Sequence, residues 1–509
     1  MLSSTARISL SEQAQQLDLR AEMMALLRQI GPGHMMNTAY DTAWVARLHK
    51  LNEPMAEEAL KWLREHQLAD GSWGAEAPVY HHDRVICTLA AAIALAERGL
   101  PEDRVRVKQA MIALDKHQAR LHLDPAGETV AFEMLLPTLI AEAKILRLIP
   151  RGGTAMLNDM VRTRETKLAK APGRMISRFT TMAFSAEMVG TDVLHILDLE
   201  SLQEENGSVG YSPSATAYFS LQTPANWKAL EYLRTYSCQG GAPNVAPFDV
   251  FERAWTLWNL ALTGFDSKEF SASQPSLDFL EASWQPRRGI GFAAGYTPRD
   301  GDDTGLIYEV LSRYGRSPDL DAVMYYEEDD YFRCFALESN PSISTNIHVL
   351  GALRQAGLSI FTPSVQKILL FLRAKQTTQG FWIDKWHTSP YYATAHLIIT
   401  CTGYNDVFVE NAVEWMLSTQ HIDGSWGYYL PTTEETAYCL QALSIWRSFG
   451  YSIPDDVLVY GAKWLIEHME RPYPPLWIGK CLYSPTLVIR STILSALLLV
   501  DQVTKQRGF

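Results

Sequence analysis

Apolar residues recur at intervals of three and four along most of the chain, with polar residues between them. The pattern is clearest in residues 56–67, 85–99 and 412–420, where it predicts helices with one apolar face. Alternating β-branched runs are scarce, and Gly and Pro separate the periodic segments. We therefore expect an all-α protein with short connections between its helices.

A short motif occurs twice, each time directly after a predicted amphipathic helix. One copy runs from Gln67 to Trp73, the other from Gln420 to Trp426, and residues 376–382 form a degenerate third copy. The Gln amide can bond free groups at neighbouring helix ends, Gly turns the chain, and the Trp packs over the turn. A single copy would be an ordinary turn with an aromatic plug, but near-identical copies far apart in the chain indicate two related helical domains.

Composition and charge narrow the functional class. The 509 residues include 45 Lys and Arg against 57 Asp and Glu, and a net charge of −12 argues against a general nucleic-acid binder. No uninterrupted apolar run reaches the ~20 residues that cross a bilayer, and the N-terminal segment lacks a signal-peptide pattern. Six widely spaced cysteines without a CxxC pair favour reduced thiols. We expect a cytoplasmic protein without a transmembrane segment.

Three carboxylates are clustered at Asp300, Asp302 and Asp303, just before the amphipathic segment 305–315. They cannot all ionise in a cavity of low dielectric constant, so one would keep its proton at a raised pKa. A protonated carboxylic acid that faces an apolar pocket can protonate an alkene. A solvated turn that caps a helix would have the same sequence, so the cluster alone leaves both interpretations open.

These motifs resemble those of terpene cyclases. The repeats are similar to the QW motif of triterpene and diterpene cyclases, and residues 40–46, 207–219, 240–252 and 476–483 are similar to motifs of class II diterpene cyclases. The resemblance covers nearly the whole chain and is especially close to bacterial members, including halimadienyl diphosphate synthases. Arg333 stands where the last Asp of an ionising DDxxD motif would be, so that motif is missing.

The resemblance implies two α-helical double-barrel domains, named β and γ. Residues 1–30 would supply the first helix of the acid-bearing β domain, residues 31–264 the inserted γ domain, and residues 265–509 the rest of the β domain. The implied reaction is the protonation-initiated bicyclisation of geranylgeranyl diphosphate with the diphosphate retained. Such an enzyme is an isomerase of the intramolecular lyase type.

The resemblance also assigns roles at the acid. Asp302 would be the proton donor, and Asp300 and Asp303 would tune and orient it. His348 occupies the position where related cyclases place a residue against the catalytic Asp, and Tyr483 is a further partner. Without the resemblance, both His348 and Tyr483 would be ordinary core residues with satisfied hydrogen bonds.

The anionic end of the substrate requires basic partners and Mg²⁺. By resemblance the segment with Lys167 and Lys170 supplies one of them, and Lys385 and Lys480 are further candidates. Each of these lysines could equally be a solvated helix charge.

The acidic Mg²⁺ motif of the plant enzymes is changed in this chain. The corresponding segment, "LDPAGETVAFE", offers Asp124 and Glu128 as candidate ligands. The ligand set for Mg²⁺ therefore remains open.

Two positions bear on the product. Plant copalyl diphosphate synthases of hormone metabolism pair a His with the Asn of a PNV motif, whereas this chain has Phe184 in place of the His and retains Asn244. A phenyl ring cannot accept a proton, although the faces of aromatic rings such as Phe184 and Trp382 stabilise positive charge. We therefore expect hydride shifts and a rearranged product, such as halimadienyl or kolavenyl diphosphate, over copalyl diphosphate.

Other interpretations stay open. A meroterpenoid or squalene-type cyclase would use the same Asp acid, and a non-enzymatic helical-barrel binding protein would have no reason to keep the three carboxylates together. For a diterpene cyclase, the expected partners are the prenyl diphosphate substrate and a downstream class I terpene synthase or phosphatase. A second copy of the chain in a homodimer is a further candidate.

Overall fold

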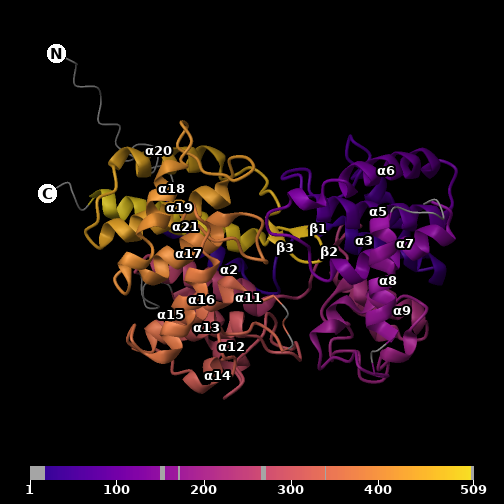
Figure 1. The fold of residues 1–509 in the computed structure, drawn as a ribbon, viewed down its shortest axis with the longest axis horizontal. Helices are drawn as coiled ribbons and strands as arrows, with labels where there is room; N and C mark the ends of the chain where they lie inside the picture. The colour runs from indigo at the N-terminus through magenta and orange to yellow at the C-terminus, as the bar shows by residue number, and fades with distance from the viewer. Residues whose placement is uncertain are drawn as a thin grey trace, which may run out of the picture.

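Two lobes of helices lie side by side, and α2 (Leu19–Gln29) and α21 (Thr486–Lys505), far apart in the sequence, pack together in one of them (Figure 1). The computed structural model describes residues 18–148, 155–169, 172–264, 271–336, 338 and 340–505. Within these ranges the strands are two short antiparallel pairs, β1 (Asn37–Thr38) with β2 (Ala242–Pro243) and β3 (Trp477–Ile478) with β4 (Leu482–Tyr483). The expected all-α class is confirmed.

The γ domain is the lobe built from the first half of the chain. Its helices are α3 (Ala39–Ala46), α4 (Pro54–Glu65), α5 (His81–Arg98), α6 (Asp103–Gln118), α7 (Phe132–Ile145), α8 (Ala155–Ala169), α9 (Pro213–Gln222) and α10 (Trp227–Tyr236), with the 3₁₀ segments η1 (Arg47–Leu51), η2 (Leu121–Leu123), η3 (Thr181–Val189) and η4 (Leu194–Ile196).

The β domain holds α2, the first helix of the described residues, and the second half of the chain. Its helices are α2 (Leu19–Gln29), α11 (Asp249–Leu262), α12 (Gln274–Ser283), α13 (Gly301–Arg313), α14 (Leu320–Met324), α15 (Ile343–Gln355), α16 (Pro363–Lys375), α17 (Pro390–Cys401), α18 (Glu410–Ser418), α19 (Thr433–Ser448), α20 (Asp455–His468) and α21 (Thr486–Lys505), with the 3₁₀ segments η5 (Ser271–Ser273) and η6 (Asp406–Phe408).

Each domain has its own apolar core. Met23 and Leu26 of α2 pack into the same core as the C-terminal half of the chain, so the first helix lies with the β domain. Trp255 and Trp258 of α11 also lie in that core, and α11 packs against α13 and α21. The γ-domain core includes Ala242. The division between the cores therefore falls before α11, earlier than the expected boundary at residue 264.

The repeated motif forms the same structure in each copy. The indole N–H groups of Trp73, Trp382 and Trp426 donate to carbonyl oxygens of the preceding helices at 2.7–2.8 Å. The amides of Gln67 and Gln420 each donate to the carbonyl of the Gly four residues later and to a carbonyl of a following helix. The repeat thus joins the helix before each turn to a later helix through buried and partly buried hydrogen bonds.

The structure contains a further copy that the sequence did not reveal. Gln203 donates to the carbonyl of Gly207 at 2.7 Å, as the other glutamines do, but Val209 occupies the place of the Trp. The N–H of Val209 donates to Thr216 at 2.9 Å, just as the N–H of Trp73 donates to Thr88. Because this copy lacks the Trp by which the other copies are recognised in the sequence, the sequence pattern does not reveal it.

Helix α21 is the one described helix that is long and apolar enough to cross a membrane by length and composition. Most of it is buried, since it packs against α11 and α19 in the β-domain core. Burial in a core accounts for its apolar character.

Candidate active site

A cavity of about 490 Å³ lies between the two domains and includes all three clustered carboxylates in its wall. Both domains contribute to it, for example through Phe184 and Asn244 from the γ domain and Trp386 and Tyr483 from the β domain. Ten of its lining residues are aromatic: Phe184, Phe248, Phe251, Phe292, Tyr296, Phe335, Trp386, Tyr392, Trp477 and Tyr483. Such a wall suits a hydrocarbon chain that carries a transient positive charge.

The start of α13 places the carboxylates in the cavity wall. Asp300 caps the helix, because its carboxylate accepts the N–H of Asp303 at 2.8 Å. Asp300 and Asp303 are buried, whereas Asp302 is half-buried. Asp302 is therefore the carboxyl group of the three that is most open to the cavity.

Burial favours the protonated form of this cluster. It raises the pKa of Asp300 to about 7, with the charge of Asp302 adding to the effect. Burial and the charges of Asp300 and Asp302 raise the pKa of Asp303 well above its ordinary value. One oxygen each of Asp300 and Asp303 has no hydrogen-bond partner among the described residues. A cluster of this kind keeps protons at neutral pH.

His348 holds Asp302 from the neighbouring helix. Its Nδ1 lies 2.7 Å from Asp302 Oδ1, and it is buried on α15. Helices α13 and α15 come close together at Gly305, where a Cβ atom would lie 2.9 Å from the backbone nitrogen of Val349. The structure thus brings His348 to Asp302, as the resemblance implied. His348 is not among the described residues that line the cavity, so of His348 and Tyr483 only Tyr483 faces the substrate space.

Turnover should fall as the pH rises through about 7. Above this pH Asp300 loses its proton, and the negative charge then present beside the carboxyl group of Asp302 makes that group a weaker acid. The pH profile of kcat, measured from about pH 5 to 9, checks this. Asp300→Asn keeps a good helix cap and should remove the decline. A profile of the unmodified protein that stays level through pH 7 would contradict this role for Asp300.

Tyr483 faces the cavity from β4. Burial raises its pKa above the ordinary value, and the negative charge of Asp303 adds to the shift. Its phenol therefore stays protonated at neutral pH. A neutral phenol can accept a hydrogen bond from an ordinary donor, but it takes up a proton only from a strongly acidic group, such as a carbocation.

Phe184 and Asn244 both line the cavity on the γ-domain side. Asn244 donates to a carboxylate oxygen of the buried Asp41 at 3.0 Å. The Phe184 ring centroid lies 4.6 Å from Lys480 Nζ. No histidine is among the described residues that line the cavity, so the wall around Phe184 offers no imidazole.

Lys480 is a structural residue in this arrangement. It is fully buried, and its ammonium donates to Glu187 at 2.6 Å and to Ser212 and Ser214 at 2.7 Å each. All of its hydrogen-bonding capacity is used, and it is not among the described lining residues. The arrangement does not support the expected role of Lys480 as a diphosphate ligand.

Lys385 is the one lysine or arginine among the described residues that line the cavity. Its ammonium pairs with Glu338, donates to the carbonyl of Asn340 at 2.6 Å, and lies 4.9 Å from the Trp386 ring centroid. It is therefore well placed to meet an anionic group. Trp382, by contrast, is the buried plug of a repeat and lies outside the described cavity wall.

The remaining lysine candidates lie largely outside the described residues. Lys170 falls in the gap between residues 169 and 172. Lys167 belongs to α8, but its side chain is not described. Their expected roles stay predictions.

The candidate magnesium ligands do not form an oxygen cluster. Asp124 accepts the N–H groups of His81 and His82 at 3.0 and 2.8 Å, and lies 2.7 Å from His82 Nδ1, so it caps α5. Glu128 is exposed, and neither residue is among the described lining residues. This geometry does not support Asp124 as a magnesium ligand.

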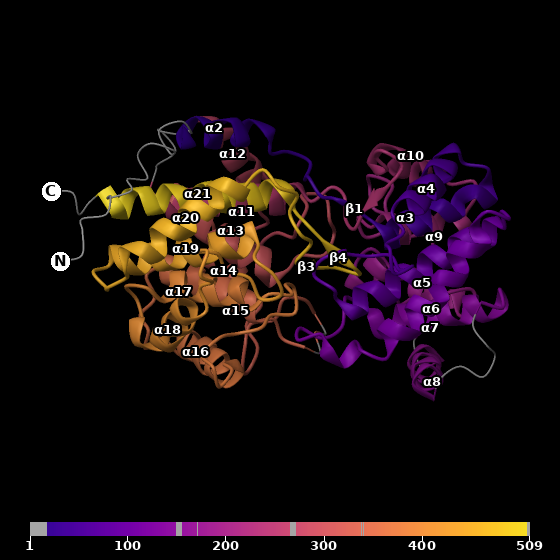
Figure 2. The same ribbon diagram turned by 90° about the horizontal axis from the view of Figure 1, so that it is seen from above.

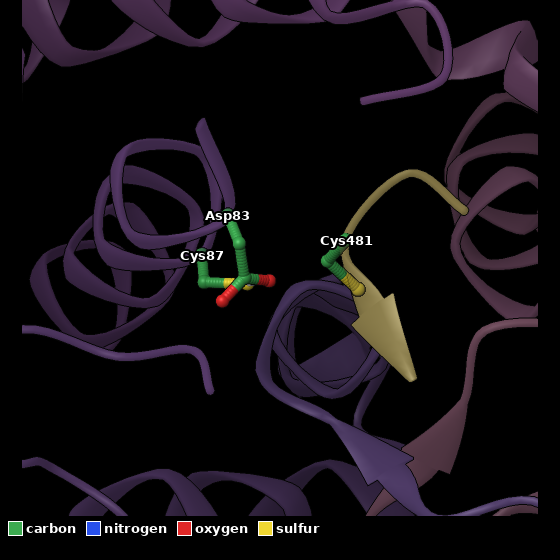
Figure 3. A group of neighbouring side chains, drawn as sticks. All are labelled: Asp83, Cys87 and Cys481. Carbon is green, nitrogen blue, oxygen red and sulfur yellow. The ribbon is translucent and has the colours of Figure 1, made fainter. Parts of the chain in front are cut away.

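One group of described side chains lies close enough together to share an ion, Asp83, Cys87 and Cys481. Figure 3 shows Cys481, next to β4, facing the two residues of α5. Burial raises the pKa of both thiols. Mg²⁺ prefers oxygen ligands, so this is not its site. Asp83 instead accepts the N–H of Leu482 at 2.8 Å, which fixes the β3–β4 hairpin to the γ domain between the lobes (Figure 2).

Two helical domains that enclose an aromatic cavity with a buried carboxylate cluster are the arrangement of a terpene cyclase. The squalene-hopene cyclase C-terminal domain family matches residues 330–446. The chain is 45% identical, over 92% of its length and 96% of the relative's, to a protein of Mycobacterium tuberculosis named Type B diterpene cyclase. It is 31% identical to an ent-copalyl diphosphate synthase of Streptomyces sp., with 86% of this chain and 88% of that protein covered.

A solved structure agrees with these relatives. The ent-copalyl diphosphate synthase of Streptomyces platensis superposes with a TM-score of 0.77 at 30% identity, covering 95% of this chain and 99% of that one. The chain belongs to the class II diterpene cyclases.

Proposed function

We propose that the substrate is geranylgeranyl diphosphate and that Asp302 protonates its terminal alkene. The observation that carries this proposal is the position of Asp302, a half-buried carboxyl group that faces an aromatic cavity while its other side contacts His348 at 2.7 Å. In the first step the O–H bond of Asp302 breaks, a C–H bond forms at the alkene, and the carbon cation closes two rings. The resulting carboxylate is stabilised by His348.

The diphosphate would remain intact and lie away from the acid. Lys385 is the described cationic side chain in the cavity wall, so we assign it to the anionic group of the substrate. Mg²⁺ stays a prediction: the described residues offer no cluster of oxygen ligands for it, and the oxygens of the diphosphate itself are of the type that Mg²⁺ prefers.

The product should be rearranged. Ring closure leaves a tertiary cation on the bicycle, and Phe184 next to Asn244 cannot remove a proton from it. Hydride shifts would then carry the charge to another ring position, where we assign the uptake of the proton to the phenol of Tyr483, one of several oxygen-bearing side chains that line the cavity. Halimadienyl or kolavenyl diphosphate is therefore favoured over copalyl diphosphate.

A substitution at Phe184 tests this proposal for the product. Phe184→His should divert part of the product toward an unrearranged labdane, because an imidazole can deprotonate the first bicyclic cation. The product ratio after removal of the diphosphate, measured by gas chromatography and mass spectrometry, checks this. Phe184→Leu is the matched control, since it removes the ring without adding a base. Copalyl diphosphate as the sole product of the unmodified protein would overturn the proposal.

Incubation of the purified protein with geranylgeranyl diphosphate and Mg²⁺ tests the reaction itself. A bicyclic diterpenyl diphosphate is expected, whereas cyclisation of squalene or of a prenylated aromatic compound instead would favour the other cyclase types. Tight binding of geranylgeranyl diphosphate without any product would favour a binding protein. The carboxylate cluster argues against that last outcome, because a binding protein gains nothing from three clustered acids, two of them buried.

A further inference from the structure

The contact between Asp302 and His348 continues to a second buried histidine. His348 Nε2 lies 3.0 Å from Nδ1 of His396 on α17, and His396 is 1% exposed. Asp302, His348 and His396 therefore form a chain of hydrogen-bonding groups that runs from the cavity wall into the β-domain core. His396 drew no attention in the sequence, because a single His in an apolar helix has the pattern of a core residue.

The surroundings of His396 keep it neutral. Its ring stacks on Trp258 of α11 at 4.5 Å and meets the edge of Tyr438 of α19 at 5.7 Å. Burial lowers its pKa well below the ordinary value, and the nearby His348 and His387 oppose a further positive charge. Two buried acidic groups begin α19. Glu434 accepts from the Tyr438 hydroxyl and the Trp477 indole and lies 3.4 Å from His387 Nε2, and Glu435 accepts from Tyr428 and Thr432.

A neutral imidazole carries one N–H, so the direction of each hydrogen bond in the chain can be worked out. If His396 Nδ1 donates, His348 Nε2 accepts, and the single proton of a neutral His348 lies on Nδ1 and points at Asp302 Oδ1. The acidic proton of Asp302 must then lie on Oδ2. If His396 accepts instead, His348 carries a proton on Nε2. In that case the Asp302 proton has either moved to Nδ1 of His348, or it stays on Asp302 and forms the hydrogen bond to Nδ1 of His348.

Only the first arrangement leaves the proton of Asp302 available to an alkene. We propose that His396 is a positioning residue that donates from Nδ1 to His348 and thereby keeps the acidic proton of Asp302 on the oxygen that His348 does not contact. When that proton moves to the substrate, the Nδ1–H of His348 stabilises the carboxylate that is left. The inference rests on the proposed role of Asp302 as the acid.

Two substitutions at His396 distinguish the effect of its hydrogen bond on kcat from the effect of its packing. His396→Phe keeps an aromatic ring against Trp258 but removes the donor, and should lower kcat for geranylgeranyl diphosphate by about 10²-fold. His396→Asn restores an N–H group near the position of Nδ1 and should recover most of this loss. KM should change by less than about threefold in both, because His396 does not line the cavity.

The control is the same substitution at another buried histidine. His117 of the γ domain is 2% exposed and contacts His81 and Asp70, so His117→Phe also removes buried hydrogen bonds. It should lower the melting temperature and leave kcat unchanged. Wild-type kcat in His396→Phe, or equal loss in His396→Asn and His396→Phe, would overturn the proposal.

The tautomer of His348 gives a test that needs no substitution at His396. In protein labelled with ¹⁵N-histidine, the His348 signals, assigned by their loss in His348→Asn, should show the proton on Nδ1. A proton on Nε2 in the unmodified protein would overturn the proposal. If Asp302→Asn remained active, the role of Asp302 itself would fail; if Asp302→Asn were inactive and His396→Phe fully active, only the role of His396 would fail.

Discussion

Asp302→Asn should lower turnover of geranylgeranyl diphosphate by about 10³-fold or more, because an amide of the same shape has no acidic proton to give. Asp300 would still cap α13 through the N–H of Asp303, so the helix and the cavity wall should persist. The measurement is kcat from product formation, together with a thermal melt that shows a folded protein. Substrate binding should persist, since the change removes no group that we assign to the diphosphate.

The matched control is Asp319→Asn. Asp319 also stands at the start of a helix, α14, where it accepts the Trp284 indole N–H at 2.7 Å, and it is not among the described lining residues. Its substitution should leave kcat unchanged. Activity of Asp302→Asn close to that of the unmodified protein would contradict the assignment of Asp302 as the acid.

Much of this site could be predicted from local sequence. The capping position of Asp300 and the order of the three carboxylates are properties of one helix start, which a short segment determines. His348 was found only through resemblance, because its contact with Asp302 depends on how α13 and α15 approach each other at Gly305. His396 was missed, since nothing in its own helix distinguishes it from a core histidine.

Two of the predicted site roles lack support for the same physical reason. The sequence predicts that Trp382 and Lys480 contact the substrate, because aromatic and basic residues suit a carbocation and a diphosphate. Trp382 instead donates to the carbonyl of Leu372 ten residues earlier, and Lys480 pairs with Glu187. The sequence shows which interactions a side chain can make, but the groups that it actually bonds to can come from segments far away in the chain. The packing of α11 also depends on segments far away in the chain, because its partners in the core are α13 and α21.

Lys480→Met should destabilise the folded protein by about 3–5 kcal/mol at pH 8, because it leaves the carboxylate of Glu187 buried without its partner. Glu187 is fully buried, and its Oε2 already lacks a hydrogen-bond partner among the described residues. Methionine has nearly the length of lysine, so little volume is lost. The measurement is the free energy of unfolding in denaturant. Lys61→Met, at an exposed pair with Glu65, is the control and should cost less than about 1 kcal/mol.

The loss in Lys480→Met should shrink as the pH is lowered. Burial raises the pKa of Asp41 to about 6, and the charge of Lys480 holds it from rising further. Without that charge the pKa of Asp41 in the folded protein should be higher still. A group whose pKa is higher in the folded than in the unfolded state favours folding at low pH, and this contribution is lost as the pH rises through the folded value. The variant should therefore be closer to the unmodified protein at pH 5 than at pH 8.

A second substitution isolates the ion pair from the remaining contacts. In the double variant Lys480→Met with Glu187→Gln, the carboxylate at position 187 is gone, so the part of the loss at pH 8 that comes from Glu187 should be recovered, while Asp41 still lacks the charge of Lys480. If the loss of stability in the double variant equalled the sum of the losses in Lys480→Met and Glu187→Gln, Lys480 and Glu187 would not stabilise each other. The hairpin that carries Lys480 also carries Tyr483 into the cavity wall. Because this buried pair joins the hairpin to the γ domain beside the Phe184 ring, Lys480→Met should also change the ratio of products, and the double variant should restore part of that ratio.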